Sequence, residues 1–303
     1  MTLTNRASQS WYESTARQRL DALVDPGSFA EFIGPQARER SPHLHIFDLP
    51  EQFDDGMIVG RATLNATPVL VAAQEGRFMG GAFGEVHGAK LTGLLRAATA
   101  LKRDVIILFD TGGVRLQEAN AGEVAIAEIM RALVVARMAG VRVIGLLGGR
   151  AGCYGGGSLI AGCCSTLVIC EQGRLSVSGP EVIETNKGVE EFDSKDRALV
   201  WRTMGGKHRY LVGGVDSYVD DSVAAFQAAA IASLDRPARL DRRLLQAEQA
   251  RLERRLAHFG AMREALDVWS ALGIDRPEAV PSLSTPDFMT IAQAKREHTD
   301  DAR

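Results

Sequence analysis

The sequence is poor in cysteine and has none of the cysteine spacings that mark a zinc site. Only four cysteines occur among 303 residues, all between Cys153 and Cys170, and there is no Cys-x-x-Cys pair. Structural zinc is typically held by such pairs, so we expect no metal site. So few cysteines are also typical of a protein from a reducing compartment.

Long apolar runs and an excess of one charge are missing too. No window approaches about 18 consecutive apolar residues, and segment 1–10 is polar, so the sequence predicts neither a membrane span nor a secretory signal. The 35 basic and 38 acidic residues give a net charge of -3, which argues against a nucleic-acid partner. With 46% hydrophobic residues, the chain is expected to be a cytoplasmic globular protein with a sizeable core.

Three common catalytic motifs are absent. Gly-x-x-x-x-Gly-Lys-Ser/Thr and Gly-x-Ser-x-Gly do not occur, and the glycines of segment 148–157 do not fit Gly-x-Gly-x-x-Gly in the required register. The two nucleotide-binding motifs are therefore excluded, and a serine hydrolase lacks its strongest mark.

Glycine, in contrast, is abundant, and its 31 residues cluster between Gly76 and Gly214. At the centre, the apolar segment 105–109 predicts a buried strand that runs into Gly112 and Gly113 and then into a helix. Backbone N–H groups in such a turn can point at a ligand beside the positive end of the helix. This predicts an oxyanion hole with Gly112 and Gly113 as donors. A tight turn without a ligand explains this stretch equally well.

The same theme recurs on both sides of this turn. Two antiparallel strands at 57–63 and 68–73 precede a glycine loop at 77–84 and a helix at 85–102, and a strand at 141–147 precedes the loop 148–157 and a short helix from Ser158. Parallel strands present their carboxyl ends at one edge of a sheet, where ligands bind. The glycines expected to line a substrate there are Gly80, Gly81, Gly148, Gly149, Gly155 and Gly156.

Cys153 and Tyr154 are the candidates in this loop for a proton donor or nucleophile. For Cys153 a buried, inert thiol is the better interpretation, because no histidine is near in sequence. Close packing of a helix on a strand explains the loop as well as a thioester-binding slot does. His87, at the start of a predicted helix, fits an acid or base and a surface or capping role equally well.

The remaining segments predict that the chain is organised in three parts. Shorter elements are expected as helices at 10–23 and 196–204 and as strands at 167–170, 175–178 and 211–216. Segment 34–45 reads as a surface connection, an amphipathic helix is predicted from 236 to about 266, and the tail 295–303 is expected to be disordered. The parts are a docking helix with its connection (1–50), the main domain (51–235) and a helical extension with a polar tail (236–303).

Segment 110–118, Asp-Thr-Gly-Gly-Val-Arg-Leu-Gln-Glu, resembles the Asp-Ser-Gly-Gly-Ala-Arg-x-Gln-Glu signature of the acyl-CoA carboxyltransferases, a branch of the crotonase superfamily. Segment 78–90 resembles that family's Gly-Gly-Ser-x-Gly-Glu-x-His-Gly-x-Lys, and segment 16–29 resembles its N-terminal motif. The resemblance covers about residues 10–235. It implies an α/β fold of the crotonase/ClpP-like kind, a spiral of stacked ββα repeats, here with a C-terminal helical extension.

Within this family, Thr111, Val114 and segment 148–154 resemble the beta subunits of biotin-independent malonate decarboxylases. This implies a lyase that, with a gamma subunit, decarboxylates a malonyl thioester on an acyl carrier protein, which a separate transferase subunit reloads. The carrier's arm is a phosphoribosyl-dephospho-CoA group, so this chain is expected to bind no cofactor, no biotin and no metal. Gly112 and Gly113 would hold the enolate oxygen, with Tyr154, Cys153 or water as proton donor.

Three alternatives remain open. The first is the carboxyltransferase beta subunit of an acyl-CoA carboxylase, although bacterial acetyl-CoA members carry an N-terminal four-cysteine zinc ribbon and this chain has no cysteine before Cys153. The second is a non-catalytic scaffold subunit. The third is an enoyl-thioester hydratase that uses Glu118 and Glu123, but Arg115 is predicted to form a structural ion pair with Glu118 across a helix turn.

Overall fold

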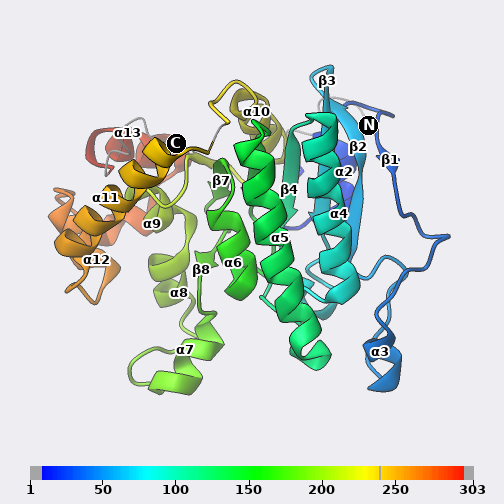
Figure 1. The fold of residues 1–303 in the computed structure, drawn as a ribbon. Helices are drawn as coiled ribbons and strands as arrows, with labels where there is room; N and C mark the ends of the chain where they lie inside the picture. The colour runs from blue at the N-terminus through cyan, green and yellow to red at the C-terminus, as the bar shows by residue number, and fades with distance from the viewer. Residues whose placement is uncertain (1–8, 239, 297–303) are drawn as a thin grey trace.

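A seven-stranded sheet runs through the protein, with helices on both faces (Figure 1). The computed structural model describes residues 9–238 and 240–296. The strands, in the order in which they lie side by side, are β1 (Ala30–Glu31), β2 (Met57–Leu64), β3 (Thr67–Gln74), β4 (Val105–Phe109), β5 (Val143–Leu147), β7 (Thr166–Cys170) and β9 (Ser217–Val219). From β3 to β9 all neighbours are parallel, whereas β1, β2 and β3 are antiparallel. The predicted α/β fold is therefore confirmed.

The strands form where the sequence predicts them because their patterns match their surroundings. Every residue of β4, β5 and β7 is buried, as expected of apolar runs covered on both faces. β2 and β3 form the predicted hairpin, and its turn residues Asn65 and Ala66 have positive φ angles of 50° and 63°.

Helices α4 (Glu85–Leu101), α5 (Asn120–Met138) and α6 (Gly155–Gly162) cover one face of the sheet, and α2 (Ala16–Leu23) and α10 (Val223–Ser233) cover the other (Figure 1). A β-carbon on Gly88 would lie 2.3 Å from that of Ala125, so glycine is what allows α4 and α5 to pack closely. On the opposite face the rings of Trp11 and Phe226 stack with centroids 4.2 Å apart. Each layer thus has its own apolar cluster.

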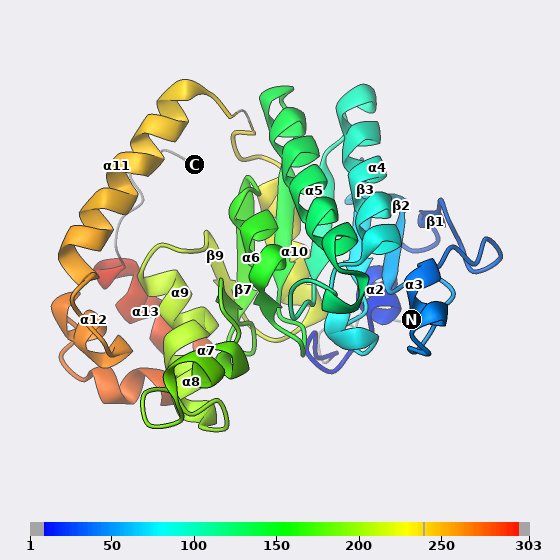
Figure 2. The same cartoon turned by 60° about the horizontal axis from the view of Figure 1, so that its bottom comes forward.

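The C-terminal helices gather beside α8 (Arg197–Met204) and α9 (Gly206–Leu211) at the β9 end of the sheet (Figure 2). They are α11 (Arg242–Phe259), α12 (Ala265–Ala271), η3 (Pro277–Ser282) and α13 (Thr285–Lys295). Trp269 and Phe288 belong to the apolar cluster on the face of the sheet that α4 and α5 cover. The boundary at residues 235 and 236 stays a prediction.

Several sequence expectations about local structure are wrong. The strand expected at 211–216 is instead the end of α9 and a loop, because Gly213 turns the chain with a φ of 67° and β9 begins at Ser217. The helix expected at 236–266 is shorter, since Asp241 caps α11 by accepting a hydrogen bond from the Leu244 N–H. The connection 34–45, in contrast, is exposed at residues 35–40 as expected of a surface segment, and it ends in the start of α3 (Pro42–Ile46).

Smaller differences lie at the termini and around the loop after β5. A small parallel sheet joins β6 (Cys153–Tyr154) to β8 (Leu175–Ser176), and α6 begins at Gly155, three residues before Ser158. Of the expected disordered tail 295–303, residues 297–303 lie outside the described part of the chain. Among the described helices, none is both long enough and apolar enough to cross a membrane.

Candidate active site

The predicted meeting of three glycine loops is confirmed. Because β3, β4 and β5 are parallel, the loops that follow them leave the sheet at the same edge. Two isolated bridges join these loops, one between Phe83 and Val114 and the other between Thr111 and Cys153. The loop after β3 and the loop after β5 thus flank the turn after β4.

The two amides predicted as oxyanion donors are not free. The Gly112 N–H donates to the Gly80 carbonyl at 2.7 Å, and the Gly113 N–H donates to Thr111 Oγ1 at 3.1 Å. The prediction that these two amides are free to bind a ligand is therefore wrong. The physical reason is the close approach of the two glycine loops, since a β-carbon on Gly81 would lie 1.8 Å from the Asp110 carbonyl oxygen.

The donors without an acceptor lie one position further along and on the adjoining helix. Phe83 pairs with both neighbours of Val114, donating to the Gly113 carbonyl and accepting from the Arg115 N–H. The Val114 N–H itself has no acceptor in the described part of the chain, and neither does the Gly156 N–H in the first turn of α6. Such unpaired first-turn donors, at the positive end of a helix, favour a negative ligand.

The Val114 turn and the start of α6 lie against each other. A β-carbon on Gly113 would be 3.6 Å from the Gly155 Cα, and Gly155 itself has a positive φ of 54°. Gly112 is exposed and Val114 and Gly155 are half-buried, so this part of the turn faces the surface. The Val114 N–H in this turn and the Gly156 N–H at the start of α6 are thus candidate donors for a carbonyl oxygen.

Gly148 and Gly149 are buried, and packing explains both. A β-carbon on Gly148 would lie 2.7 Å from Cδ1 of Trp11, and one on Gly149 would lie 2.1 Å from the carboxyl carbon of Asp110. This is the close packing that the sequence left open as an alternative. That Gly148 and Gly149 also contact substrate stays a prediction.

Asp110, the first residue of the signature segment, is a positioning residue that the sequence analysis missed. It is buried, and its carboxylate accepts hydrogen bonds from Arg19 Nη1 and from the Ala151 N–H, both at 2.7 Å. Arg19 also donates to the carbonyls of Trp11 and Tyr12. Through Arg19, the carboxylate therefore ties α2 to the loop after β5.

A buried ionic cluster supports the turn from the other side. Arg115 forms the predicted ion pair with Glu118 at 2.7 Å and a second ion pair with Asp55 at 3.0 Å, and all three side chains are fully buried. Glu118 also accepts a hydrogen bond from the Glu85 N–H at the start of α4. Burial raises the pKa of Asp55, although the adjacent Arg115 opposes that shift. Glu118 is thus a structural group, and Glu123 is exposed on α5, which leaves the hydratase alternative without its acid pair.

Cys153 and Tyr154 have different surroundings although they are adjacent. Cys153 lies in the core, and burial raises the pKa of its thiol well above the usual value, as the inert interpretation requires. The Tyr154 hydroxyl is buried, and the Arg174 guanidinium lies 6.0 Å from the centroid of the Tyr154 ring. Burial also raises the pKa of Tyr154, with Arg174 opposing, so the phenol stays protonated at physiological pH.

His87 is fully buried, which excludes the surface role that the sequence left open as one alternative. Its backbone N–H donates to an Asp55 carboxylate oxygen, and its ring nitrogens lie 3.0 Å from the Asp55 carbonyl oxygen and 3.1 Å from Gln74 Nε2. Burial lowers the pKa of His87 to about 3, which keeps the ring neutral at physiological pH.

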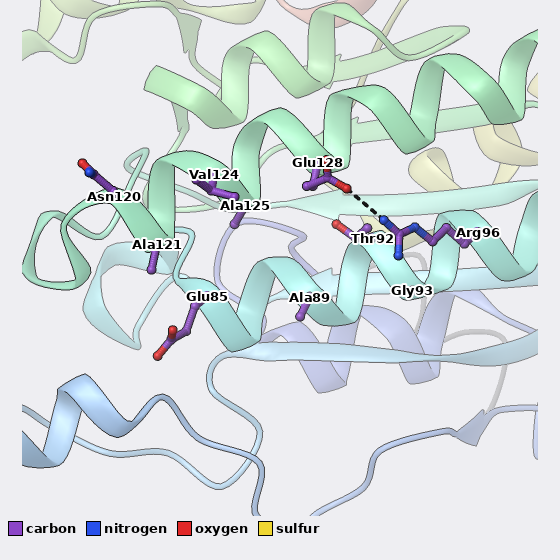
Figure 3. Close-up of a pocket in the computed structure, with 10 residues that line it drawn as sticks. All are labelled: Glu85, Ala89, Thr92, Gly93, Arg96, Asn120, Ala121, Val124, Ala125 and Glu128. Atoms are coloured by element: carbon purple, nitrogen blue, oxygen red, sulfur yellow. Dashed lines mark hydrogen bonds and ion pairs between the residues drawn. The ribbon is translucent and has the colours of Figure 1, made fainter.

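No metal centre forms among the residues that the structure describes, since no cluster of three or more His, Cys, Asp or Glu side chains is placed to hold one. A groove of about 530 Å³ lies between α4 and α5, with Glu85 and Asn120 at one end and the ion pair of Arg96 and Glu128 at the other (Figure 3). It contains none of the predicted site residues.

Comparison with known proteins gives consistent matches. The model of the carboxyl transferase domain matches residues 12–228. The chain is 37% identical to the malonyl-S-ACP:biotin-protein carboxyltransferase of Malonomonas rubra over 97% of this chain and 98% of that protein. It is 31% identical to the propionyl-CoA carboxylase beta chain of Saccharopolyspora erythraea, over 68% of this chain but only 38% of that protein.

Solved structures agree with these matches. The chain superposes on a Pseudomonas malonate decarboxylase hetero-tetramer in complex with malonate, with a TM-score of 0.76 and 35% identity, over 94% of this chain and 97% of that one. It also resembles the Pseudomonas malonate decarboxylase MdcD–MdcE hetero-dimer, with a TM-score of 0.64 and 34% identity over 83% and 99% of the two chains.

Proposed function

Because this chain belongs to the carboxyl transferase domain family, we propose that it is the beta subunit of a cytoplasmic, biotin-independent malonate decarboxylase. The similarity to malonyl thioester and malonate enzymes extends over nearly the whole chain. The substrate would be a malonyl thioester on an acyl carrier protein, and the products an acetyl thioester and carbon dioxide. The phosphoribosyl-dephospho-CoA arm belongs to the carrier, so this chain needs no biotin and no metal.

In the proposed mechanism the thioester oxygen lies between the Val114 and Gly156 amides. As the bond to the carboxylate breaks, its electron pair moves into the thioester and a negative charge grows on that oxygen. Two N–H donors from different loops stabilise this enolate more than the neutral ground state, and each is worth roughly 2.7 to 4 kcal/mol. A proton, from Tyr154 or a bound water, then adds to the carbon. The single observation that carries the proposal is this pair of amides without acceptors.

The site also needs a partner to exclude water. The turn lies at the surface, and large apolar side chains near it are exposed, among them Leu116 at 78% and Val177 at 63%. A second subunit placed over this surface would cover them and lower the local dielectric, which strengthens the donors. We propose that this partner is the gamma subunit, with the carrier protein and its transferase as further components.

The proposal is tested by carbon dioxide release from malonyl carrier protein, with the chain co-purified with its gamma partner. We expect turnover that avidin does not inhibit, and little or none from the chain alone. Inhibition by avidin would favour transfer to a biotin protein, the activity in the name of the Malonomonas relative. Full activity of the partner alone would make this chain a scaffold.

The role of the Val114 N–H is tested by replacing the peptide bond between Gly113 and Val114 with an ester. This replacement deletes the Val114 N–H and keeps the Val114 side chain. We expect kcat to fall by about 10² to 10³ while the complex still assembles on gel filtration. Valine incorporated by the same route is the control. Wild-type turnover by the ester variant would contradict the assignment of Val114.

A further inference from the structure

A second pocket lies between α9 and α11, outside the site described above. Its volume is about 330 Å³, and apolar side chains from the C-terminal helices, among them Leu252, Leu256, Phe259 and Val268, form part of its wall. The family match ends at residue 228, so the C-terminal extension supplies this wall. The pocket therefore depends on a segment that the carboxyl transferase domain does not include.

Every polar side chain that lines this pocket is a hydrogen-bond donor. These side chains are His208, Arg209 and Arg255, and no carboxylate, amide or hydroxyl side chain is among the lining residues. His208 Nδ1 accepts a hydrogen bond from Trp269 Nε1 at 3.2 Å. Burial lowers the pKa of His208 to about 3, so the neutral ring carries its one proton on Nε2 and uses it as a donor.

Arg209 is the unexplained group. No hydrogen bond or ion pair joins its guanidinium to a described residue, and its Nε is buried, whereas the residue as a whole is half-buried. Burial and the neighbouring Arg255 lower the pKa of Arg209 to about 10. Removing a charged guanidinium from water without giving it a hydrogen-bond acceptor costs free energy, and a second positive charge nearby increases that cost.

Two arginines on α11 differ from Arg209, which lies on α9, because the structure shows what they contact. Arg251 and Arg255 donate to the carbonyls of Gly213 and Val212 at 3.1 and 2.8 Å, and so attach α11 to the end of α9. Such contacts give Arg251 and Arg255 a role in the fold. They leave the charge of Arg209, in the last turn of α9, without an acceptor.

We propose that this pocket binds a small organic anion, a phosphate or carboxylate attached to a short hydrocarbon. The anionic group would accept hydrogen bonds from Arg209 and His208 beside the positive charge of Arg255, and guanidinium geometry suits both kinds of oxyanion. The hydrocarbon would lie against Leu252 and Phe259. The volume equals that of roughly ten waters at about 30 Å³ each, enough for a ligand of that size.

The test is calorimetric titration of the full chain with butyl phosphate, butyrate, inorganic phosphate and butanol. We expect saturable binding of one butyl phosphate or one butyrate, and whichever binds more tightly identifies the anionic group. Inorganic phosphate should bind at least tenfold more weakly than butyl phosphate, because it lacks the hydrocarbon, and butanol should not bind. If neither organic anion binds to the wild-type chain, the proposal fails.

Two variants locate the binding. Arg209→Gln should weaken binding at least tenfold and remove the anion-induced rise in melting temperature. It should not lower the melting temperature in anion-free buffer, because no described residue accepts a hydrogen bond from the Arg209 side chain. A merely structural arginine would destabilise the chain when replaced. Arg243→Gln, at an exposed position on α11, is the matched control and should bind as the wild type does. Wild-type affinity in the Arg209 variant, or equal loss in both variants, would overturn the assignment.

Discussion

The hydroxyl of Thr111 is the most informative single group to remove. It is fully buried, accepts the Gly113 N–H at 3.1 Å and donates to the Gly113 carbonyl at 3.3 Å. In Thr111→Val the Gly113 N–H loses its acceptor inside the protein, which costs about 1–3 kcal/mol for an unsatisfied buried donor. We therefore expect the free energy of unfolding in urea to fall by that amount.

Thr111→Ser is the matched control, because it keeps the hydroxyl and removes only the methyl group. That methyl packs close to Gly157, where a β-carbon would lie 2.4 Å from Thr111 Cγ2. Loss of one buried methyl costs about 1 kcal/mol, and the serine variant should keep wild-type turnover in the carbon dioxide release assay. The carboxyltransferase signature itself has serine at this place.

The same pair of variants distinguishes two sites for the enolate oxygen. If the Val114 and Gly156 amides bind it, the Thr111 hydroxyl holds the turn in shape, and Thr111→Val should lower kcat at least tenfold. If the Gly113 amide binds it, the valine variant frees that N–H, and kcat should hold or rise. A valine variant that is faster than the serine variant would refute our placement of the donors.

Two further predictions concern the buried groups around the turn. Arg115→Met leaves Asp55 and Glu118 buried without a cation, so we expect a loss of about 3–5 kcal/mol in urea unfolding at pH 7. That loss should shrink at pH 5, because burial raises the folded pKa of Asp55, which then takes up a proton more readily once Arg115 is gone. A loss that does not depend on pH would contradict this role of the cluster. His87 has its pKa lowered to about 3, so its neutral ring supports stability above the unfolded value of 6.5, and that support is lost as the pH falls from 6.5 toward 3. His87→Gln should flatten this acid slope by up to roughly 1.4 kcal/mol per pH unit, and an unchanged slope would show that His87 is not responsible.

The features that sequence predicts well are those fixed by local pattern. The apolar pentad 105–109 is the buried central strand β4, and the hairpin turn is at Asn65 and Ala66 as expected. Segment 211–216 shows the limit of this reasoning, because Leu-Val-Gly-Gly-Val has the composition of a strand. Packing of α9 against β7 and β9 instead keeps Leu211 helical, and Gly213 reverses the chain.

The site itself depends on contacts between residues far apart in sequence. Asp110 meets Arg19 across 91 positions, and the Gly112 amide meets the Gly80 carbonyl from another loop. The signature segment identifies the right turn, but it does not reveal which N–H groups remain unpaired. That outcome is decided by the bridge between Phe83 and Val114, whose partner strand the sequence does not specify.

Side chains hold the site in shape, whereas main-chain groups are proposed to bind the substrate, and this difference limits what side-chain mutation can reveal. Most side chains of the signature hold the scaffold: Asp110 anchors a loop, and Arg115 and Glu118 form the buried cluster. The groups proposed to meet the substrate belong to the main chain, which side-chain replacement does not remove. Alanine at Gly81 would clash with Asp110 and displace the whole turn, so its loss of activity would report positioning and not the identity of a donor. The ester at Val114 removes the donor and keeps every side chain, and it also weakens the Gly113 carbonyl as an acceptor for the Phe83 N–H.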